Sequence, residues 1–556
     1  PTRFDGPDIL MVAFAIVALI GLFALLRWSR LGTAIRAAAD APQRALSLGI
    51  DVFKVGGRVW VVAGALTAVV AVIGAMGSPA QEAGSLSVAA TVRILAVAVL
   101  ARMTSPGRAV AAGIAIGILD QAVVWAFEST ALADGAFLAV IAIALLLQRA
   151  RRSRADDEAM SSWKADRELA GVPTELASLG SITTARRLFW VLAGAVTLGF
   201  PWAMSPSQTN AAAVVLIYAM VGLSLLVLTG WAGQISLGQF AFAAIGGYVT
   251  AILSAQLHFP MLLALAAGAI AGAGMALLVG IPALKVKGLN LAVITMAFAL
   301  TTSAILLNPT YLGRNIPETL DRPSFLGMDL ADQRTFYYFT LLTLIGAIGV
   351  VAGIRRSRIG RALLAARDND VAAQSFGINL LRVRLSAFAI SGALSAFAGG
   401  LFAFHQGGVK AAAFSPEISI SMFLMAVIGG LGSIGGPIIG AVYVGLLNLF
   451  STTPFLTLLG TGGGLVALLL VAPGGLAQVI ASVRVAWMRR IAERHNIVVP
   501  SLLADEEIEA ITHRRFRILP KTRPGGGEEF VPSRYSLDDQ WGIASKVPEL
   551  QEDRVG

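Results

Sequence analysis

Three glycines and three polar side chains lie between two apolar runs, in the segment Gly230-Trp-Ala-Gly-Gln-Ile-Ser-Leu-Gly238 and the adjoining Gln239. A glycine costs about 1 kcal/mol in a helix interior, so this spacing predicts a helix break. In lipid, such a break is tolerated only where it is buried or lines a cavity. Its freed backbone groups, with Gln234, Ser236 and Gln239, then suit a zwitterionic solute. A short turn in water, or close packing of helices through small residues, explains the pattern equally well.

A polar, basic stretch occurs twice at one fixed offset. Residues 27–68 and 355–396 align without a gap when shifted by 328 positions, and most of the shared residues are Ala, Gly, Ser, Arg or Asp. Self-similarity at a long period indicates one structural unit used twice. The alanines favour helix and Gly377 ends it, so each copy is expected to form a short helix and a glycine turn before the next apolar run. An ordinary basic loop is the alternative, but it does not explain the shared alanine, glycine and aspartate positions.

We interpret the two copies as rigid knobs that dock a partner which also comes in pairs, and an ATPase is the partner we expect. The residues assigned to this coupling surface are Ala365, Ala366, Asp368, Ala372, Ala373 and Gly377 in the second copy, and Ala37, Ala38, Asp40 and Gly49 in the first.

Motifs for catalysis are absent from the sequence. It contains no G-x-x-x-x-G-K-[ST], no G-x-S-x-G and no H-E-x-x-H. It also contains no cysteine, which excludes disulfides, thiol catalysis and thiolate metal sites. Its four histidines lack the spacing of metal ligands. We therefore expect no enzyme activity, no catalytic residue, and no metal or cofactor in this chain, so that ATP and Mg²⁺ would be bound by partner subunits.

The composition is that of a membrane protein. Hydrophobic residues make up 56% of the chain and charged residues only 14%, against about a quarter charged in soluble domains. The mean hydropathy is +0.75. The net charge of +10 does not indicate nucleic-acid binding, because the Arg and Lys residues concentrate in loops between apolar runs.

The chain is predicted to be an all-α polytopic membrane protein in two homologous parts. A bilayer needs about 20 apolar residues per helix, and some fifteen transmembrane or re-entrant segments are expected. They lie near 9–26, 58–76, 88–101, 109–127, 134–148, 187–204, 211–229, 236–257, 260–280, 289–307, 336–354, 385–404, 419–430, 436–450 and 455–471. The segments 88–101 and 419–430 are short enough to be re-entrant or half helices.

Charge predicts the orientation. Alternation through these segments places four basic regions on one side, and the loops on the opposite side hold few or balanced charges. Basic loops face the cytoplasm, so we expect a multi-pass protein of the cytoplasmic (inner) membrane with its C-terminus inside. The basic regions are Arg27–Arg58, Arg149–Arg187, Arg355–Arg384 and the tail from Arg484.

Charges inside the predicted spans are sparse, which favours energy delivered from outside the membrane over ion coupling. Arg93 and Asp120 are exceptions, and we expect them to form a structural ion pair. His405, at the outer end of its span, is expected to be structural.

Four segments are predicted: a partial permease domain of about five spans in 1–150, a cytoplasmic linker in 151–186, a complete domain of about ten spans in 187–482, and a cytoplasmic extension in 483–556.

These residues resemble a known family. Gly222–Tyr248 (GLSLLVLTGWAGQISLGQFAFAAIGGY), Arg361–Leu401 and Gly429–Gly440 (GGLGSIGGPIIG) resemble, in the expected order, three landmarks of branched-chain amino acid ABC importer permeases. Residues 1–150 resemble the back half of the companion permease subunit. The resemblance implies a fused pair of permeases in the ABC importer permease fold, working with two ABC ATPase subunits and an external, periplasmic substrate-binding protein.

The first part departs from the family pattern. It has no counterpart of residues 230–248, and its match to the glycine-rich landmark, VLARMTSPGRA at 99–109, has lost most glycines. We therefore expect another polypeptide to supply the missing permease half, unless this half is degenerate. For Gly429–Gly440 a packing or turn role is favoured over a pore role.

The expected function is translocation of Leu, Ile or Val from the binding protein to the cytoplasm, with no nucleic acid involved. The same architecture carrying urea, short amides or other amino acids is the nearest alternative. An ATP-independent channel or carrier, and a membrane scaffold with a signalling tail, are rivals of other classes. The resemblance favours a pore or gate role for the break, with a substrate path of Gly230, Gly233, Gln234, Ser236, Gly238, Gln239 and Asn290, and Asn308 as a further liner.

Overall fold

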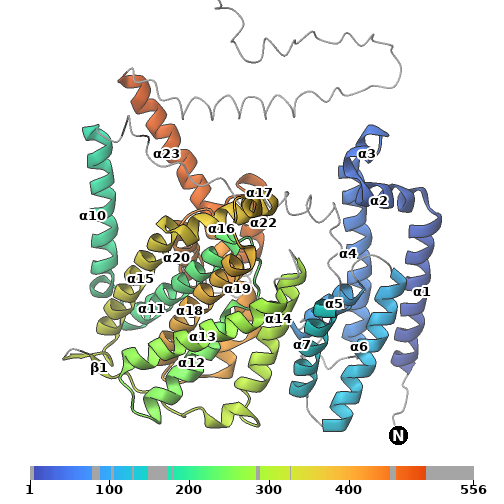
Figure 1. The fold of residues 1–556 in the computed structure, drawn as a ribbon, viewed down its shortest axis with the longest axis horizontal. Coiled ribbons are helices and arrows are strands. Elements are labelled where there is room, and N and C mark those ends of the chain that lie inside the picture. The colour runs from blue at the N-terminus through green and yellow to red at the C-terminus, as the bar shows by residue number, and fades with distance from the viewer. Residues whose placement is uncertain are drawn as a thin grey trace, which may run out of the picture. The chain divides into compact units, whose positions relative to one another are not determined.

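The computed structural model in Figure 1 is built almost entirely of helices. It describes residues 6–77, 88–101, 106–127, 130–147, 173, 176, 179–283, 289–325, 327–450 and 459–495. The predicted linker lies mostly outside these ranges, as does the predicted tail beyond residue 495. Within them, the strands are β1 (Ser324–Phe325) and β2 (Met328–Asp329), a small antiparallel hairpin.

The first part of the chain forms seven helices in the described ranges. They are α1 (Gly6–Trp28), α2 (Arg30–Asp40), α3 (Pro42–Ser47), α4 (Val52–Gly77), α5 (Val88–Leu100), α6 (Pro106–Phe127) and α7 (Thr130–Leu147).

The second part holds the longer series. Its helices up to the second repeat are α10 (Gly180–Ala203), α11 (Pro206–Leu225) continued by the π-helical η1 (Leu226–Trp231), α12 (Gln239–Ala255), α13 (Met261–Ala283), α14 (Leu289–Thr301) continued by the π-helical η2 (Thr302–Leu306), and the 3₁₀-helix η3 (Leu312–Asn315). The remainder are α15 (Gln333–Arg356), α16 (Arg358–Asp368), α17 (Asp370–Ser375), α18 (Leu380–Gln406), the 3₁₀-helix η4 (Ala411–Phe414), α19 (Pro416–Gly429), α20 (Gly435–Phe450), the π-helical η5 (Leu459–Gly463), α22 (Gly464–Val471) and α23 (Gly475–Arg494).

The predicted apolar segments fall on these helices as far as the described residues reach. The segment 455–471 is described only from residue 459, where η5 and α22 cover it. Within the described ranges, six helices are long and apolar enough to cross a membrane alone, and a seventh is added if α1 and α2, which are bent by 73°, count as one span. Several others are shorter because breaks or glycine turns divide them. At 1.5 Å per residue, α5 and α19 are only about 20 Å long, which is less than the ~30 Å hydrocarbon core. Neither therefore crosses the core by itself, as their short segments predicted.

Caps mark where helices begin next to water. Ser205 and Gln208 form a reciprocal capping box at the start of α11, with Pro206 as the first helical residue. Asp332 caps α15 by accepting from the Thr335 backbone N–H at 3.0 Å. This hydrogen bond holds the pKa of the Asp332 carboxyl below its usual value, so the carboxylate stays charged at the positive end of the helix.

Glycines let the central helices α12, α13 and α18 pack closely. A Cβ on Gly246 of α12 would overlap the backbone of Ala396 in α18, and one on Gly399 of α18 would overlap Ala243. In the same way, Gly272 of α13 meets Gly392 of α18. Small residues at helix crossings are how membrane helices gain close van der Waals contact without a hydrophobic driving force.

The turn between α19 and α20 also requires glycines, because the chain approaches itself closely there. Gly430 has φ +101°, and a Cβ on Gly429 or Gly436 would overlap backbone atoms across the turn. The structure thus confirms the packing and turn role expected for Gly429–Gly440.

The two exceptional ionisable groups of the first part do form an ion pair. Arg93 Nη2 lies 3.3 Å from Asp120 Oδ1, joining α5 to α6, and the guanidinium also lies over the Phe137 ring. His405 packs against the rings of Phe336 and Phe402, as a structural role predicts.

Gly272 and Gly274 lie on the same helix and differ in what surrounds them. A Cβ on Gly272 would collide with Ala396 and with the Gly392 carbonyl, whereas nothing lies within 4 Å of one on Gly274. Gly272→Ala is expected to lower the unfolding free energy by about 1–3 kcal/mol through overpacking. Gly274→Ala should leave it unchanged or raise it by up to about 1 kcal/mol, since alanine is the better helix former. Thermal unfolding of the purified protein in detergent compares the two, and equal midpoints would contradict this packing.

Candidate functional site

The predicted helix break exists and is buried. The chain leaves helical geometry after Trp231 and resumes it at Gln239, and Gly233 has φ +67°. Gln234 is 4% exposed, and Ser236 and Gln239 are fully buried. A Cβ on Gly230 would lie 2.6 Å from the Leu431 carbonyl oxygen, so the chain passes very close to the α19–α20 turn. The break is thus buried within the protein.

Side chains from other helices satisfy the backbone of the break. Thr295 Oγ1 of α14 accepts a hydrogen bond from the Leu237 N–H at 2.9 Å. Ser419 Oγ of α19 accepts one from the Phe240 N–H at 3.1 Å. Within the break, Thr229 Oγ1 donates to the Gln234 carbonyl at 3.0 Å. Buried backbone groups need such partners because water is not available to them.

Gln239, predicted to face a solute, forms the centre of a polar cluster through its Nε2 and its backbone carbonyl. Its Nε2 donates to Ser224 Oγ of α11 at 2.8 Å and to Ser391 Oγ of α18 at 2.7 Å. Ser391 Oγ donates to the Ser224 carbonyl, and Ser395 Oγ donates to the Gln239 carbonyl at 2.7 Å. The side chain therefore ties α11, α12 and α18 together. Among the described residues, no protein partner reaches Gln239 Oε1 or Ser236 Oγ.

The two repeated loops have the same backbone fold. In each, a short helix, α2 or α16, is followed by a second one, α3 or α17, where a single helix had been predicted. The joints are Ala41, with φ −149°, and Asn369, with φ −155°. Each loop then turns at a glycine of positive φ, +82° at Gly49 and +77° at Gly377. Only glycine adopts this geometry without strain, which explains why both copies carry it.

The caps of the two loops also correspond. Ser29 Oγ accepts from the Gly32 N–H at 2.9 Å, and Ser357 Oγ accepts from the Gly360 N–H at 3.3 Å. The Ile50 N–H donates to the Ala45 carbonyl at 2.9 Å, as the Ile378 N–H does to Ala373 at 3.1 Å. Local hydrogen bonds thus maintain each loop as a defined shape rather than an ordinary basic linker.

The helix that follows each loop begins with a corresponding cap. Asp51 accepts from the Lys54 N–H at 3.1 Å, and Asn379 from the Arg382 N–H at 3.2 Å. Hydrogen bonding to the Lys54 side chain holds the pKa of the exposed Asp51 carboxyl below its usual value.

Both loops expose a large apolar side chain immediately before the turn glycine. Leu48 is 78% exposed and its counterpart Phe376 is 86% exposed. At the start of the next helix, Phe53 and its counterpart Leu381 are 85% and 55% exposed. The two loops thus expose apolar residues at corresponding positions.

The second loop contacts the break directly. Arg367, near the end of α16, donates from Nη1 to the Gly230 carbonyl at 2.8 Å. Its Cγ lies 3.1 Å from where a Cβ on Gly233 would stand. Arg384 of α18 pairs with Asp370 of α17 at 2.6 Å, which holds α17 onto the long helix.

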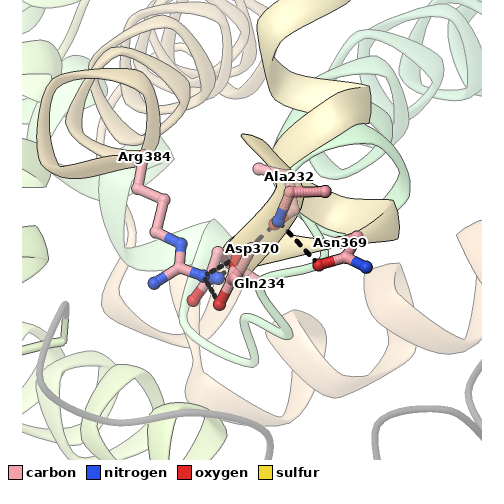
Figure 2. A network of polar contacts seen from close by, with 6 residues as sticks. Ala232, Gln234, Asn369, Asp370 and Arg384 are labelled. Atoms are coloured by element: carbon pink, nitrogen blue, oxygen red, sulfur yellow. Dashed lines mark hydrogen bonds and ion pairs between the residues drawn. The ribbon is translucent and has the colours of Figure 1, made fainter. Parts of the chain in front are cut away.

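Figure 2 shows Arg384 reaching Asp370, with Asn369 at the start of α17 and Gln234 and Ala232 of the break in the same network. The second loop therefore lies beside the break, and the Arg367–Gly230 hydrogen bond joins them.

The remaining predicted residues are distributed as follows. Ala366 and Ala373 are buried under the loop, and Asp368 Oδ1 accepts from Arg367 Nη2 at 2.9 Å. Asn308 accepts from the Thr310 N–H in a turn. Asn290 lies in α14, but its side chain is outside what the structure describes.

Sequence reasoning missed Arg367. Its signal was available in the repeat, where Arg367 aligns with Ala39 although the residues on both sides, Ala366 and Asp368, match Ala38 and Asp40.

Replacing Gln239 tests whether it is structural. Gln239→Leu keeps the shape but leaves buried hydroxyls without a donor, so the unfolding free energy should fall by about 1–3 kcal/mol. The control is Gln256→Leu, an exposed glutamine with one hydrogen bond to the Asn315 carbonyl, which should change it by about 0.5 kcal/mol or less. Thermal unfolding in detergent measures both. A Gln239→Leu protein as stable as its control would show that the cluster does not hold the helices.

Comparisons of the sequence with known proteins identify the family. A family model described as "Branched-chain amino acid transport system / permease component" matches residues 3–146 and 207–488. The high-affinity branched-chain amino acid transport system permease protein LivM of Salmonella typhimurium is 29% identical over 342 residues, which are 56% of this chain and 80% of that protein. LivM of Escherichia coli K12 is 28% identical over 339 residues, 56% of this chain and 79% of that protein.

A probable LivH permease of Methanocaldococcus jannaschii is 33% identical over 150 residues, 25% of this chain and 47% of that protein. No solved structure matches the chain. Because the family model covers well over half of the residues, and because six of the described helices are long and apolar enough to cross a membrane, this chain belongs to the all-α, multi-pass family of permease components of branched-chain amino acid transport systems.

Proposed function

We propose that this chain is the membrane permease of an ATP-driven ABC importer that moves Leu, Ile or Val from an external binding protein to the cytoplasm. The observation that carries the proposal is the duplicated loop, which presents the same capped helices and exposed apolar residue twice, at Leu48 and Phe376. A partner that occurs as two similar subunits fits two similar surfaces. ATPase subunits that bind ATP and Mg²⁺ are such partners, and the relatives' names support branched-chain amino acids as cargo.

The proposed partners therefore comprise two ATPases, a periplasmic binding protein and another polypeptide that supplies a permease half. The chain itself would sit in the inner membrane with its basic loops and C-terminus in the cytoplasm. The basic residues gathered around α16 and α17 support this orientation.

The break is the proposed solute path. Ser236 Oγ and Gln239 Oε1 are buried acceptors without a protein partner among the described residues, and such acceptors suit the ammonium group of an amino acid. The glycines of the break permit the backbone to approach a small solute closely.

Reconstitution tests the function. Membrane vesicles containing the chain, its ATPases and its binding protein should accumulate labelled leucine only with ATP, and excess isoleucine and valine should compete. Competition by urea or acetamide instead would show that the importer carries urea or short amides. Accumulation that does not need ATP would overturn the importer assignment.

Cysteines introduced into this cysteine-free chain test the orientation. Ser375→Cys in α17 and Ala412→Cys in η4 are both at exposed positions. In cells with a permeabilised outer membrane, an impermeant maleimide should label Ala412→Cys directly and Ser375→Cys only after the inner membrane is opened. The reverse labelling pattern would invert the topology.

Substitutions at two glycines of positive φ distinguish a role of the second loop in coupling from a general loss of stability. Gly377, with φ +77°, lies in the loop, and Gly407, with φ +65°, ends α18 away from it; neither has atoms within 4 Å of an added Cβ. A valine at either position should cost about 1–3 kcal/mol of stability through the same backbone strain. Only Gly377→Val should lower the leucine transported per ATP hydrolysed, measured in the reconstituted vesicles. Equal transport ratios for the two variants would remove the loop from coupling.

A further inference from the structure

We infer that Arg367 transmits the movement of the second docking loop to the buried break, and that the first loop docks a partner without such a transmission. This inference rests on the proposed function. It assigns unequal roles to two loops whose backbones have the same fold.

The first step is the contact between Arg367 and the break. Its guanidinium spans two groups: Nη1 donates to the Gly230 carbonyl at 2.8 Å, while Nε and Nη2 donate to Asp368 at 3.0 and 2.9 Å. The Arg367 side chain is only 15% exposed. Such a planar, charge-assisted fork has one favoured geometry, so it fixes the end of α16 relative to Gly230.

The second step is that the Gly230 carbonyl lies where the helix ends, so its hydrogen bond to Arg367 affects the geometry of the break. Gly230 is the penultimate residue of η1, after which the chain leaves helical geometry. The last carbonyls of a helix have no partner within the helix, and a cation is favoured at this negative end. Moving Arg367 away would therefore leave the Gly230 carbonyl without its charged donor in a buried place. A shift of α16 is thus coupled to the geometry of the break.

The third step is that α17 is bound to the same assembly. The Asp370–Arg384 pair, at 2.6 and 2.7 Å, joins the start of α17 to α18 (Figure 2). These side chains are 20% and 11% exposed, so solvent screens the pair only partly. The second loop therefore moves together with α18 and the break, rather than independently of them.

The last step is the comparison of the two copies. The offset of the repeat aligns Arg367 with Ala39, Asp370 with Pro42 and Arg384 with Gly56. None of these three counterparts has a side chain that can make a hydrogen bond or an ion pair. The first loop nevertheless keeps its serine cap, its glycine turn and its exposed apolar residue. The serine cap, the glycine turn and the exposed apolar residue, which suit docking, are thus present in both loops. The side chains that bond a loop to the break and to the following long helix are present only in the second loop.

The test follows the break itself in the complete complex. Ser236→Cys supplies a single thiol in the cysteine-free chain, and its rate of maleimide labelling is compared with and without ATP. With Arg367 intact, ATP should change this rate. In Arg367→Ala the ATPases should still co-purify and hydrolyse ATP, but the ATP-dependent change should disappear and leucine transported per ATP should fall about tenfold or more, as expected for loss of a charged hydrogen bond.

Two further variants make the result specific. Arg361→Ala on the same helix removes a similar hydrogen bond, 2.8 Å to the Arg356 carbonyl, that does not reach the break, and its labelling should still respond to ATP. Arg367→Lys keeps a charged donor without the fork and should restore part of the response, which also excludes misfolding of the alanine variant as the cause.

The outcomes separate this inference from the proposed function. If the unaltered complex binds no ATPase or takes up no leucine with ATP, the proposed function fails and the inference with it. If the complex works and Arg367→Ala still responds to ATP as before, only the inference is overturned. Loss of ATPase binding in Arg367→Ala would also overturn it, since Arg367 would then be a docking residue.

Discussion

The structure depends on one constraint, which is that the backbone of a buried helix break must find its hydrogen-bond partners within the protein. The break at residues 232–238 and the residues that flank it meet this constraint with groups from several helices, each from a different part of the sequence. Thr295 comes from α14, Ser419 from α19 and Arg367 from α16. Removing any one element would leave a polar group buried without a partner, so the packing of these helices and the geometry of the break determine each other. Close glycine contacts among α12, α13 and α18 then hold the frame in which the break sits.

The same constraint connects the interior to the second repeated loop. Arg367 belongs to this loop, because its backbone lies in α16, and its guanidinium bonds to the Gly230 carbonyl beside the break. In the first copy the corresponding residue is Ala39, whose side chain cannot make such a bond. The two copies therefore share a backbone fold and differ in this contact.

Much of this was predictable from local patterns. The glycine spacing predicted the break, the offset of 328 predicted the paired loops, and the turn at Gly377 was confirmed with φ +77°. The break, each loop and the glycine turn are determined by residues that are close together in the sequence. The family resemblance was likewise confirmed by the family model.

What the sequence did not predict depends on residues far apart. The sequence did not predict that the amide of Gln239 donates to Ser391, 152 positions away. Arg367 was not among the candidates because its partner Gly230 is 137 positions away. The joint at Asn369 was missed because the alanines around it favour a continuous helix. In the structure, the Asn369 side chain caps α17 by accepting from the Ala372 N–H. Polar residues in a membrane protein have several possible partners, and only the fold selects among them.

The central claim is that the two loops are equivalent docking surfaces for ATPase subunits. The most direct measurement places a photo-crosslinking amino acid at Leu48 or at Phe376 in cells that carry the whole complex, with Ala412 as a control position, and identifies the captured proteins. The account predicts that both loop positions crosslink to a nucleotide-binding ATPase subunit and that Ala412 does not. Capture of no ATPase at either loop position would contradict it.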